Sequence, residues 1–87
     1  MALSAVLHRV ADYDAWRKVY DSVADLQKAG GVTAESVHRM ADDPDNVLVL
    51  HHFATLAEAR AFFDNPALHD AMKQGGVKGD LRIEFYE

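Results

Sequence analysis

The stretch Val47-Leu48-Val49-Leu50-His51-His52-Phe53 decides the fold of this 87-residue chain. Four apolar residues in succession place bulk on both faces of a strand, because successive side chains point to opposite sides of a sheet. Such a strand has to be covered on both faces. A chain of this length cannot cover two sides of a sheet by itself, so the sequence predicts one α+β layer that completes itself by dimerising.

The composition is that of one folded domain spanning residues 1–87. Hydrophobic residues make up 49% and charged residues 26% of the chain, which argues against disorder. The absence of cysteine excludes disulfides and thiolate chemistry. A net charge of −5 with scattered basic residues argues against a nucleic-acid partner. No apolar run approaches the ~20 residues that span a membrane, and no secretion signal is apparent, so we expect a cytoplasmic protein without a membrane partner.

Hydrophobic periodicity and capping signals predict the order of the elements. Asp12 is placed to cap the first helix, and Thr55 with Glu58 forms a capping box for the second. Asn65-Pro66 interrupts the second helix, because proline disfavours an α conformation in the preceding residue. The predicted elements are strand 3–10, a helix from Asp12 to about Ala29, strand 32–40, a tight turn at 41–46, strand 47–53, a helix from Thr55 to the Asn65-Pro66 interruption, a helical piece 67–74 and strand 80–86.

This β-α-β-β-α-β order predicts a ferredoxin-like α+β fold. With right-handed crossovers the four antiparallel strands take the order 4-1-3-2, which places strand 47–53 inside the sheet. The two helices cover only one face of that sheet. The other face would expose valine and leucine side chains to water, so we predict a homodimer in which two sheets stack.

Three segments carry a resemblance to a known family: Val10-Ala11-Asp12-Tyr13-Asp14-Ala15-Trp16, Ala41-Asp42-Asp43-Pro44-Asp45, and Ala59-Arg60-Ala61-Phe62-Phe63 before Asn65-Pro66-Ala67-Leu68. The chain resembles the small dimeric α/β-barrel proteins of the antibiotic biosynthesis monooxygenase superfamily, some of which are labelled cyclases. The resemblance spans nearly the whole chain and implies a dimeric α/β barrel. The superfamily includes cofactor-free oxygenases acting on aromatic polyketides or quinols, haem-degrading enzymes, and proteins with no assigned reaction, so the resemblance implies one of these three. The Asn, Trp and His set of the haem-degrading branch has no clear match, so we expect no cofactor.

Five histidines supply the main candidates for chemistry. A hairpin that pairs Met40 with Val47 places His38 opposite Val49. Pairing Val10 of the first strand with Val47 likewise places His8 opposite Val49, on the other side of the strand. This register predicts three histidines on one face of the sheet and a fourth on the dimer-facing side, namely His8, His38 and His51 against His52.

His8 is the predicted catalytic residue, as a general base, because an unperturbed imidazole titrates near neutral pH. The alternative is a buried histidine bonded to a neighbour. Five residues are predicted to bind an aromatic substrate by lining a pocket: Trp16, Tyr20, His38, His51 and Tyr86. Trp16 and Tyr20 could equally be core residues, and Tyr86 could belong to a solvated strand face. No carboxylate or motif spacing completes a metal site, so no metal ligand is predicted.

Two functions therefore stay open. The first is a cofactor-free oxygenase or cyclase, in which an electron-rich aromatic anion reacts in a dry cavity and the protein supplies a base. The second is a non-catalytic dimeric module, binding a small molecule or acting in a stress response, in which the histidines are structural. The sequence favours neither.

Overall fold

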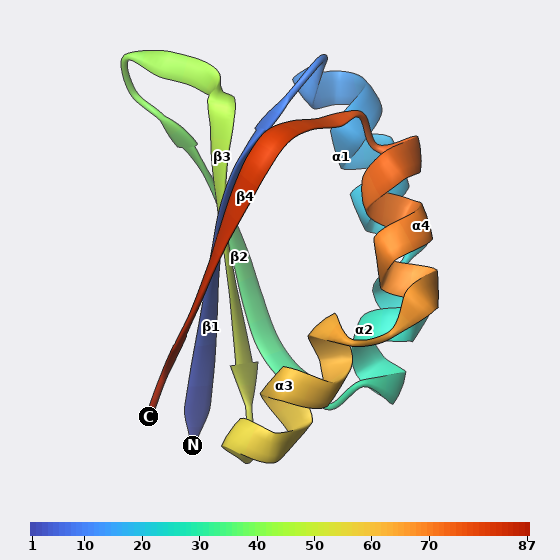
Figure 1. Cartoon of the computed structure of the whole chain (residues 1–87), viewed down its shortest axis with the longest axis vertical. Coiled ribbons are helices and arrows are strands. Elements are labelled where there is room, and N and C mark those ends of the chain that lie inside the picture. The colour runs from blue at the N-terminus through green and yellow to red at the C-terminus, as the bar shows by residue number, and fades with distance from the viewer.

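The computed structural model describes all 87 residues as one sheet with helices on one of its faces (Figure 1). The elements follow in the order β1 (Ala2–Val10), α1 (Tyr13–Ser22), α2 (Ala24–Ala29), β2 (Val32–Met40), β3 (Asp43–Phe53), α3 (Leu56–Phe63), α4 (Pro66–Gln74) and β4 (Val77–Tyr86). The antiparallel sheet has the order β2-β3-β1-β4. This is the predicted order 4-1-3-2 counted from the other edge, and the ferredoxin-like α+β fold is confirmed.

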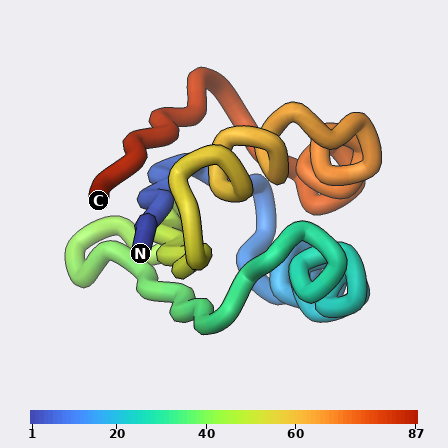
Figure 2. The backbone as a smooth tube through the Cα atoms, turned by 90° about the horizontal axis from the view of Figure 1, so that it is seen from below, coloured from blue at the N-terminus to red at the C-terminus, as the bar shows by residue number.

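The helices form two neighbouring coils beyond the sheet, α1 with α2 and, separately, α4 (Figure 2). α3 lies between α4 and the strands in that view. The two chain ends lie near each other because β1 and β4 are antiparallel neighbours, with Leu3 opposite Tyr86 (Figure 1). No helix is long and apolar enough to cross a membrane.

The helix starts follow the capping signals. The Asp12 side chain accepts a hydrogen bond from the Asp14 backbone N–H at 3.1 Å. Thr55 Oγ1 accepts from the Glu58 N–H at 3.2 Å, which is the first bond of the predicted capping box. Glu58 Oε1 accepts from the Thr55 hydroxyl at 3.2 Å, whereas a full capping box would have it accept from the Thr55 backbone N–H. Asn65 caps α4, whose first residue is proline and so lacks an N–H that would need a partner.

The predicted first helix, by contrast, divides into two. α1 ends at Ser22, and the Val23 N–H bonds back three residues to the Tyr20 carbonyl instead of continuing the α pattern. Ser22 Oγ donates to the Val19 carbonyl at 2.6 Å. A side-chain hydroxyl that competes for a helix carbonyl in this way weakens the regular backbone ladder, which accounts for the break.

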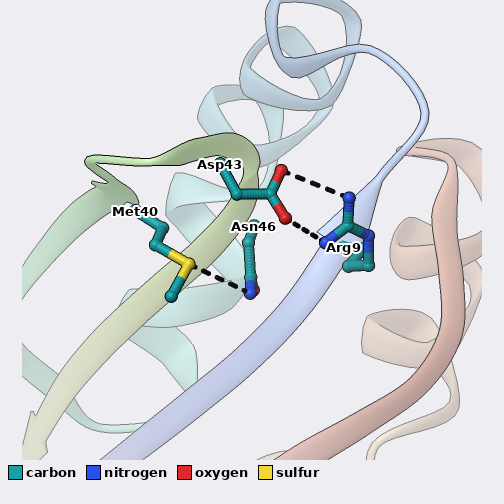
Figure 3. Close-up of polar contacts among 4 residues, drawn as sticks. All are labelled: Arg9, Met40, Asp43 and Asn46. Atoms are coloured by element: carbon teal, nitrogen blue, oxygen red, sulfur yellow. Dashed lines mark hydrogen bonds and ion pairs between the residues drawn. The ribbon is translucent and has the colours of Figure 1, made fainter.

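The hairpin between β2 and β3 is tighter than predicted. Its turn is Ala41-Asp42, and Met40 pairs with Asp43, so Pro44 lies within β3. β1 pairs with β3 only as far as Asn46, so no β1 residue lies opposite Pro44. Proline has no backbone N–H to donate, and it is tolerated here because no partner on that side needs one. Figure 3 shows the polar contacts here: Arg9 forms a two-pronged ion pair with Asp43, and Asn46 Nδ2 lies 3.7 Å from Met40 Sδ.

The register of β2 corrects a prediction. His38 pairs with Leu48, and Arg39 pairs with Val47, one residue away from the predicted pairing. The short turn and the irregularity between Arg39 and Met40 cause this slip. Because a one-residue slip moves a side chain to the other face, the prediction that His38 shares a face with His8 and His51 is wrong.

The first strand is displaced by two residues from the predicted pairing, so its faces are unchanged. His8 pairs with Val47, Val6 with Val49, and Ser4 with His51. These alternate residues face the helices and are buried, whereas the residues between them form an open face without helices. β4 also begins earlier than predicted, at Val77, with an irregularity in its pairing to β1 between Leu7 and Arg9.

Candidate functional site

A cavity of about 50 Å³ lies between the sheet and the helices. Strands β1 and β3, helices α1 to α4 and the residue between α1 and α2 all contribute to its wall. Space of this size holds a few water molecules. Its lining is mainly apolar and contains no lysine, arginine, aspartate or glutamate: Val6, His8, Trp16, Val19, Tyr20, Val23, Gln27, Val49, His51, Phe63, Leu68, Ala71 and Met72.

The two cavity histidines lie toward opposite ends of the sheet surface. His8 and Ser4 are four positions apart on β1, and His51 is directly opposite Ser4. At about 3.4 Å per residue, this places the backbones of His8 and His51 about 14 Å apart. Val6 and Val49 pair between them and form an apolar floor. The two imidazoles therefore act on different parts of the cavity and do not contact each other.

Two aromatic residues of α1 connect these ends from above. The Trp16 ring is 5.5 Å from that of His8, edge to face, and stacks on Tyr20 at 5.0 Å. Tyr20 in turn stacks on His51 at 6.2 Å with nearly parallel planes. Trp16 and Tyr20 are four apart on the helix, so both project from the same face toward the sheet. The structure thus brings four of the six predicted site residues into one aromatic row.

Trp16 is also held by the end of α4. A Cβ built on Gly75 would lie 3.0 Å from Trp16 Cδ1, closer than side chains ordinarily pack. Glycine at this position lets the end of α4 approach the indole closely. Gly75 is also the C-cap of α4, so helix termination and packing on Trp16 both favour glycine at this position.

His8 is buried, with 4% of its surface exposed. Burial lowers the pKa of His8, and a hydrogen bond to the Val47 backbone opposes the change in part. The imidazole is therefore neutral at neutral pH. Its Nδ1 has no hydrogen-bond partner among the protein atoms. A neutral imidazole of this kind can accept a proton or a hydrogen bond from a molecule in the cavity.

His51 is equally buried but has a polar partner. Its Nε2 lies 3.2 Å from the Tyr20 hydroxyl, and its Nδ1 has no partner. Burial lowers the pKa of His51 to about 4, although the charge of Glu35 favours the protonated form. The Tyr20 hydroxyl donates to Glu35 Oε2 at 2.7 Å, and burial followed by this bond raises the pKa of Tyr20.

Two predicted site residues lie outside the cavity. His38 is exposed on the open face, where its Nε2 lies 3.0 Å from Ser36 Oγ. Tyr86 is 49% exposed and pairs with Leu3, so it shares the open face. His52, predicted to face away from the pocket, does lie on the open face and is half-buried.

Glu35 and Gln27 contribute to the site but were not predicted. Glu35 is directly opposite His51 on β2, and the erroneous register had placed Ser36 there instead. Gln27 is 7% exposed and lines the cavity. It follows Tyr20 and Val23 at helical spacing, and this spacing was an available signal for a polar residue turned inward.

A second, more open hollow of about 360 Å³ lies between α4 and β4. It shares Phe63 and Met72 with the cavity, so these two side chains separate the two spaces. His69 borders the hollow, and its Nε2 lies 2.6 Å from the Phe63 carbonyl oxygen. No group of three or more histidine, aspartate or glutamate side chains is arranged to hold a metal ion.

Solved structures with this fold come from several bacteria. A candidate antibiotic biosynthesis monooxygenase of Deinococcus radiodurans is 22% identical, with a TM-score of 0.76 over 100% of this chain and 91% of that chain. One of Bordetella bronchiseptica is 10% identical, with a TM-score of 0.85 over 99% and 94%. SnoaB, a cofactor-independent oxygenase of Streptomyces nogalater, is 8% identical, with a TM-score of 0.76 over 99% and 89%.

Neither a protein-family model nor a curated protein sequence matches the chain. The identities to the solved structures are low, so the likeness concerns the fold and extends over nearly the full length of each chain. The sequence resemblance stated above is therefore confirmed at the level of architecture. The chain has the ferredoxin-like fold of the antibiotic biosynthesis monooxygenase-like proteins.

Proposed function

We propose that the chain is a cofactor-free oxygenase or cyclase that binds an aromatic, quinol-like or polyketide-like molecule between the sheet and the helices. One observation carries this proposal: two buried, neutral histidines with unpaired Nδ1 atoms line a single apolar cavity. An unpaired buried nitrogen costs about 1–3 kcal/mol, which a ligand hydroxyl would offset. The fold likeness to SnoaB, a cofactor-independent oxygenase, supports the same reaction class.

His8 is the proposed general base. It would take a proton from a phenolic or enolic hydroxyl beneath the Trp16 ring, and the resulting electron-rich anion would react with dioxygen or with its own side chain. Trp16 and Tyr20 would hold the flat ring, and His51 would contact its far end. The substrate supplies the electrons in this scheme, so the protein needs no redox group. His38 and Tyr86 have no place in the proposal because both lie on the open face.

A ring-sized ligand needs more room than about 50 Å³. Met72 and Phe63 separate the cavity from the larger hollow beside β4. Methionine is unbranched and adapts its shape readily, so Met72 is the side chain we expect to move when a ligand enters. The present cavity and the adjoining hollow would then form one binding site.

Oxygen uptake with a hydroquinone substrate tests the reaction. Replacing His8 by alanine should lower the rate by about 10²- to 10⁴-fold, the usual contribution of a general base. His38→Ala, on the open face, is the matched control and should keep the wild-type rate. His8→Gln retains a polar side chain and guards against a loss of activity through misfolding. Wild-type turnover that persists in both His8 variants would overturn the assignment of His8.

The narrow cavity also favours a second candidate, a non-catalytic binding module. In that case an aromatic ligand binds in a 1:1 ratio without oxygen uptake, and His8→Ala leaves binding unchanged. The same set of proteins separates the two functions, because only the enzyme shows turnover. A cytoplasmic location stays a prediction for either function.

We also propose a homodimer formed through the open sheet face. Leu48 and Leu50 lie there half-buried, and Leu7 is 37% exposed. A continuous apolar strand surface of this kind is typical of an interface. Sedimentation velocity at micromolar concentration should show a dimer for the wild type and a monomer for Leu50→Lys. A wild-type monomer at that concentration would contradict the stacked-sheet assembly.

A further inference from the structure

Three polar side chains form a chain from the protein surface to the cavity. Glu35 is exposed on β2 and pairs with His51 on β3. The half-buried Tyr20 hydroxyl lies 2.7 Å from Glu35 Oε2 and 3.2 Å from His51 Nε2, and so joins the two. The second ring nitrogen of His51, Nδ1, is buried and has no partner among the protein atoms.

The hydrogen-bonding capacity of these groups fixes where each proton lies. A carboxylate only accepts, so the single proton of the Tyr20 hydroxyl points to Glu35. The tyrosine oxygen then has only lone pairs to offer His51, which must donate from Nε2–H. A neutral imidazole carries one N–H, so Nδ1 is left as an acceptor. Glu35 and Tyr20 therefore determine which ring nitrogen of His51 carries the proton.

The cavity lining restricts the charge of the ligand. No cationic or anionic side chain borders it. A charged ligand would lose its hydration without gaining a partner of opposite charge, and burial of an unpaired charge is strongly unfavourable. A neutral molecule with a hydroxyl group loses less hydration free energy on entering the cavity, and it can donate a hydrogen bond to the unpaired Nδ1 of His51.

We infer that the Glu35–Tyr20–His51 chain holds His51 as the Nε2–H tautomer and thereby selects neutral ligands that donate a hydroxyl proton to Nδ1. The inference rests on the proposed function for the location of the ligand. Tyr20 and Glu35 act here as positioning residues through His51. The ligand class that follows is a phenol or enol in its protonated form, in preference to an ether, a ketone or a carboxylate.

The tautomer can be measured without any ligand. Nitrogen-15 NMR of ring-labelled histidine at neutral pH should show His51 with a protonated Nε2 and an unprotonated Nδ1. Tyr20→Phe removes the acceptor and should abolish this preference. Glu35→Gln, an exposed substitution that keeps the fold, lets the Tyr20 proton turn toward His51 and should shift the ring toward Nδ1–H. Glu84→Gln, an open-face carboxylate, is the control and should change nothing.

A wild-type ring with the proton on Nδ1 would overturn the inference, as would a tautomer that neither Tyr20→Phe nor Glu35→Gln alters. The ligand preference is tested with phenol and methoxybenzene, which are similar in size, although only phenol has a hydroxyl proton. The wild type should bind phenol about tenfold more tightly, the gain of one hydrogen bond. In His8→Ala, which lacks the other unpaired ring nitrogen of the cavity, this preference should persist, and adding Tyr20→Phe should reduce the ratio toward one. Equal binding by the wild type would overturn the inference alone. Failure of both probes to bind would overturn the proposed function as well.

Discussion

The two faces of the sheet are made from the same strands, yet histidines on the two faces lie in different environments. On the covered face, His8 and His51 are each 4% exposed and each has an unpaired ring nitrogen. On the open face, His38 is exposed beside Ser36 and His52 is half-buried. Neighbours in sequence, such as His51 and His52, fall on opposite sides. The position along the pleat, rather than the residue type, therefore decides which imidazoles line the apolar cavity.

The largest expected effect compares Val49 with Leu50, adjacent residues on opposite faces of β3. Val49 is 3% exposed and forms the cavity floor. Val49→Lys would bury an unpaired charge and should cost more than about 4 kcal/mol of unfolding free energy, enough to unfold a domain of this size. Leu50→Lys should stay folded, because its ammonium group reaches water on the open face. Circular dichroism during urea denaturation measures both.

If Leu50→Lys unfolded as completely as Val49→Lys, Leu50 would be as essential to the packing within one subunit as Val49, and the contrast between the faces would fail. The paired design matters because both variants introduce the same charge on the same strand. A difference in strand propensity therefore cannot account for different outcomes.

A smaller effect should appear in the dependence of stability on pH. Burial lowers the pKa of His51 from 6.5 to about 4. Between these values the unfolded chain binds a proton that the folded chain does not, so the unfolding free energy falls as the pH falls from about 6.5 to about 4. The loss is about 3 kcal/mol for His51, and the lowered pKa of His8 adds to it in the same direction.

Urea denaturation at pH 7 and pH 4 measures this loss. His51→Leu should remove most of it, whereas His38→Leu on the open face should retain it. Because the three proteins share every carboxylate, comparing them isolates the contribution of the histidine. An equal loss in the wild type and in His51→Leu would show that burial does not hold this imidazole neutral.

The sequence carried enough information for the elements and their order, but less for the site. The predicted register placed His8 and His51 on one face, which the structure confirms, and capping residues located the helix starts. The side of the sheet on which His38 lies depended on a two-residue turn and an irregularity at Met40, and these are not visible in the hydrophobic pattern. Because of the same one-residue slip, Glu35 was not predicted as the residue opposite His51. Side-chain pairing across strands is a tertiary property that one-dimensional periodicity does not determine.

The first helical region, α1 and α2, was also predicted only in part. Trp16 and Tyr20 were predicted to line a pocket, and both line the cavity. The break after Ser22 depends on a local bond from its hydroxyl to the Val19 carbonyl, which alters the backbone without altering the spacing of the apolar residues. Gln27 lines the cavity from α2, and its helical spacing from Tyr20 and Val23 was the one signal for that position.

The most direct test of the central claim is an NMR titration of the labelled protein with 1-naphthol, a flat aromatic molecule with one hydroxyl. The account predicts that amide shifts concentrate on the covered face, at Val6, Val49 and Trp16, together with a shift of the His8 and His51 ring nitrogens. Shifts confined to the open face around Leu48 and His52, or no saturable shifts at all, would contradict it.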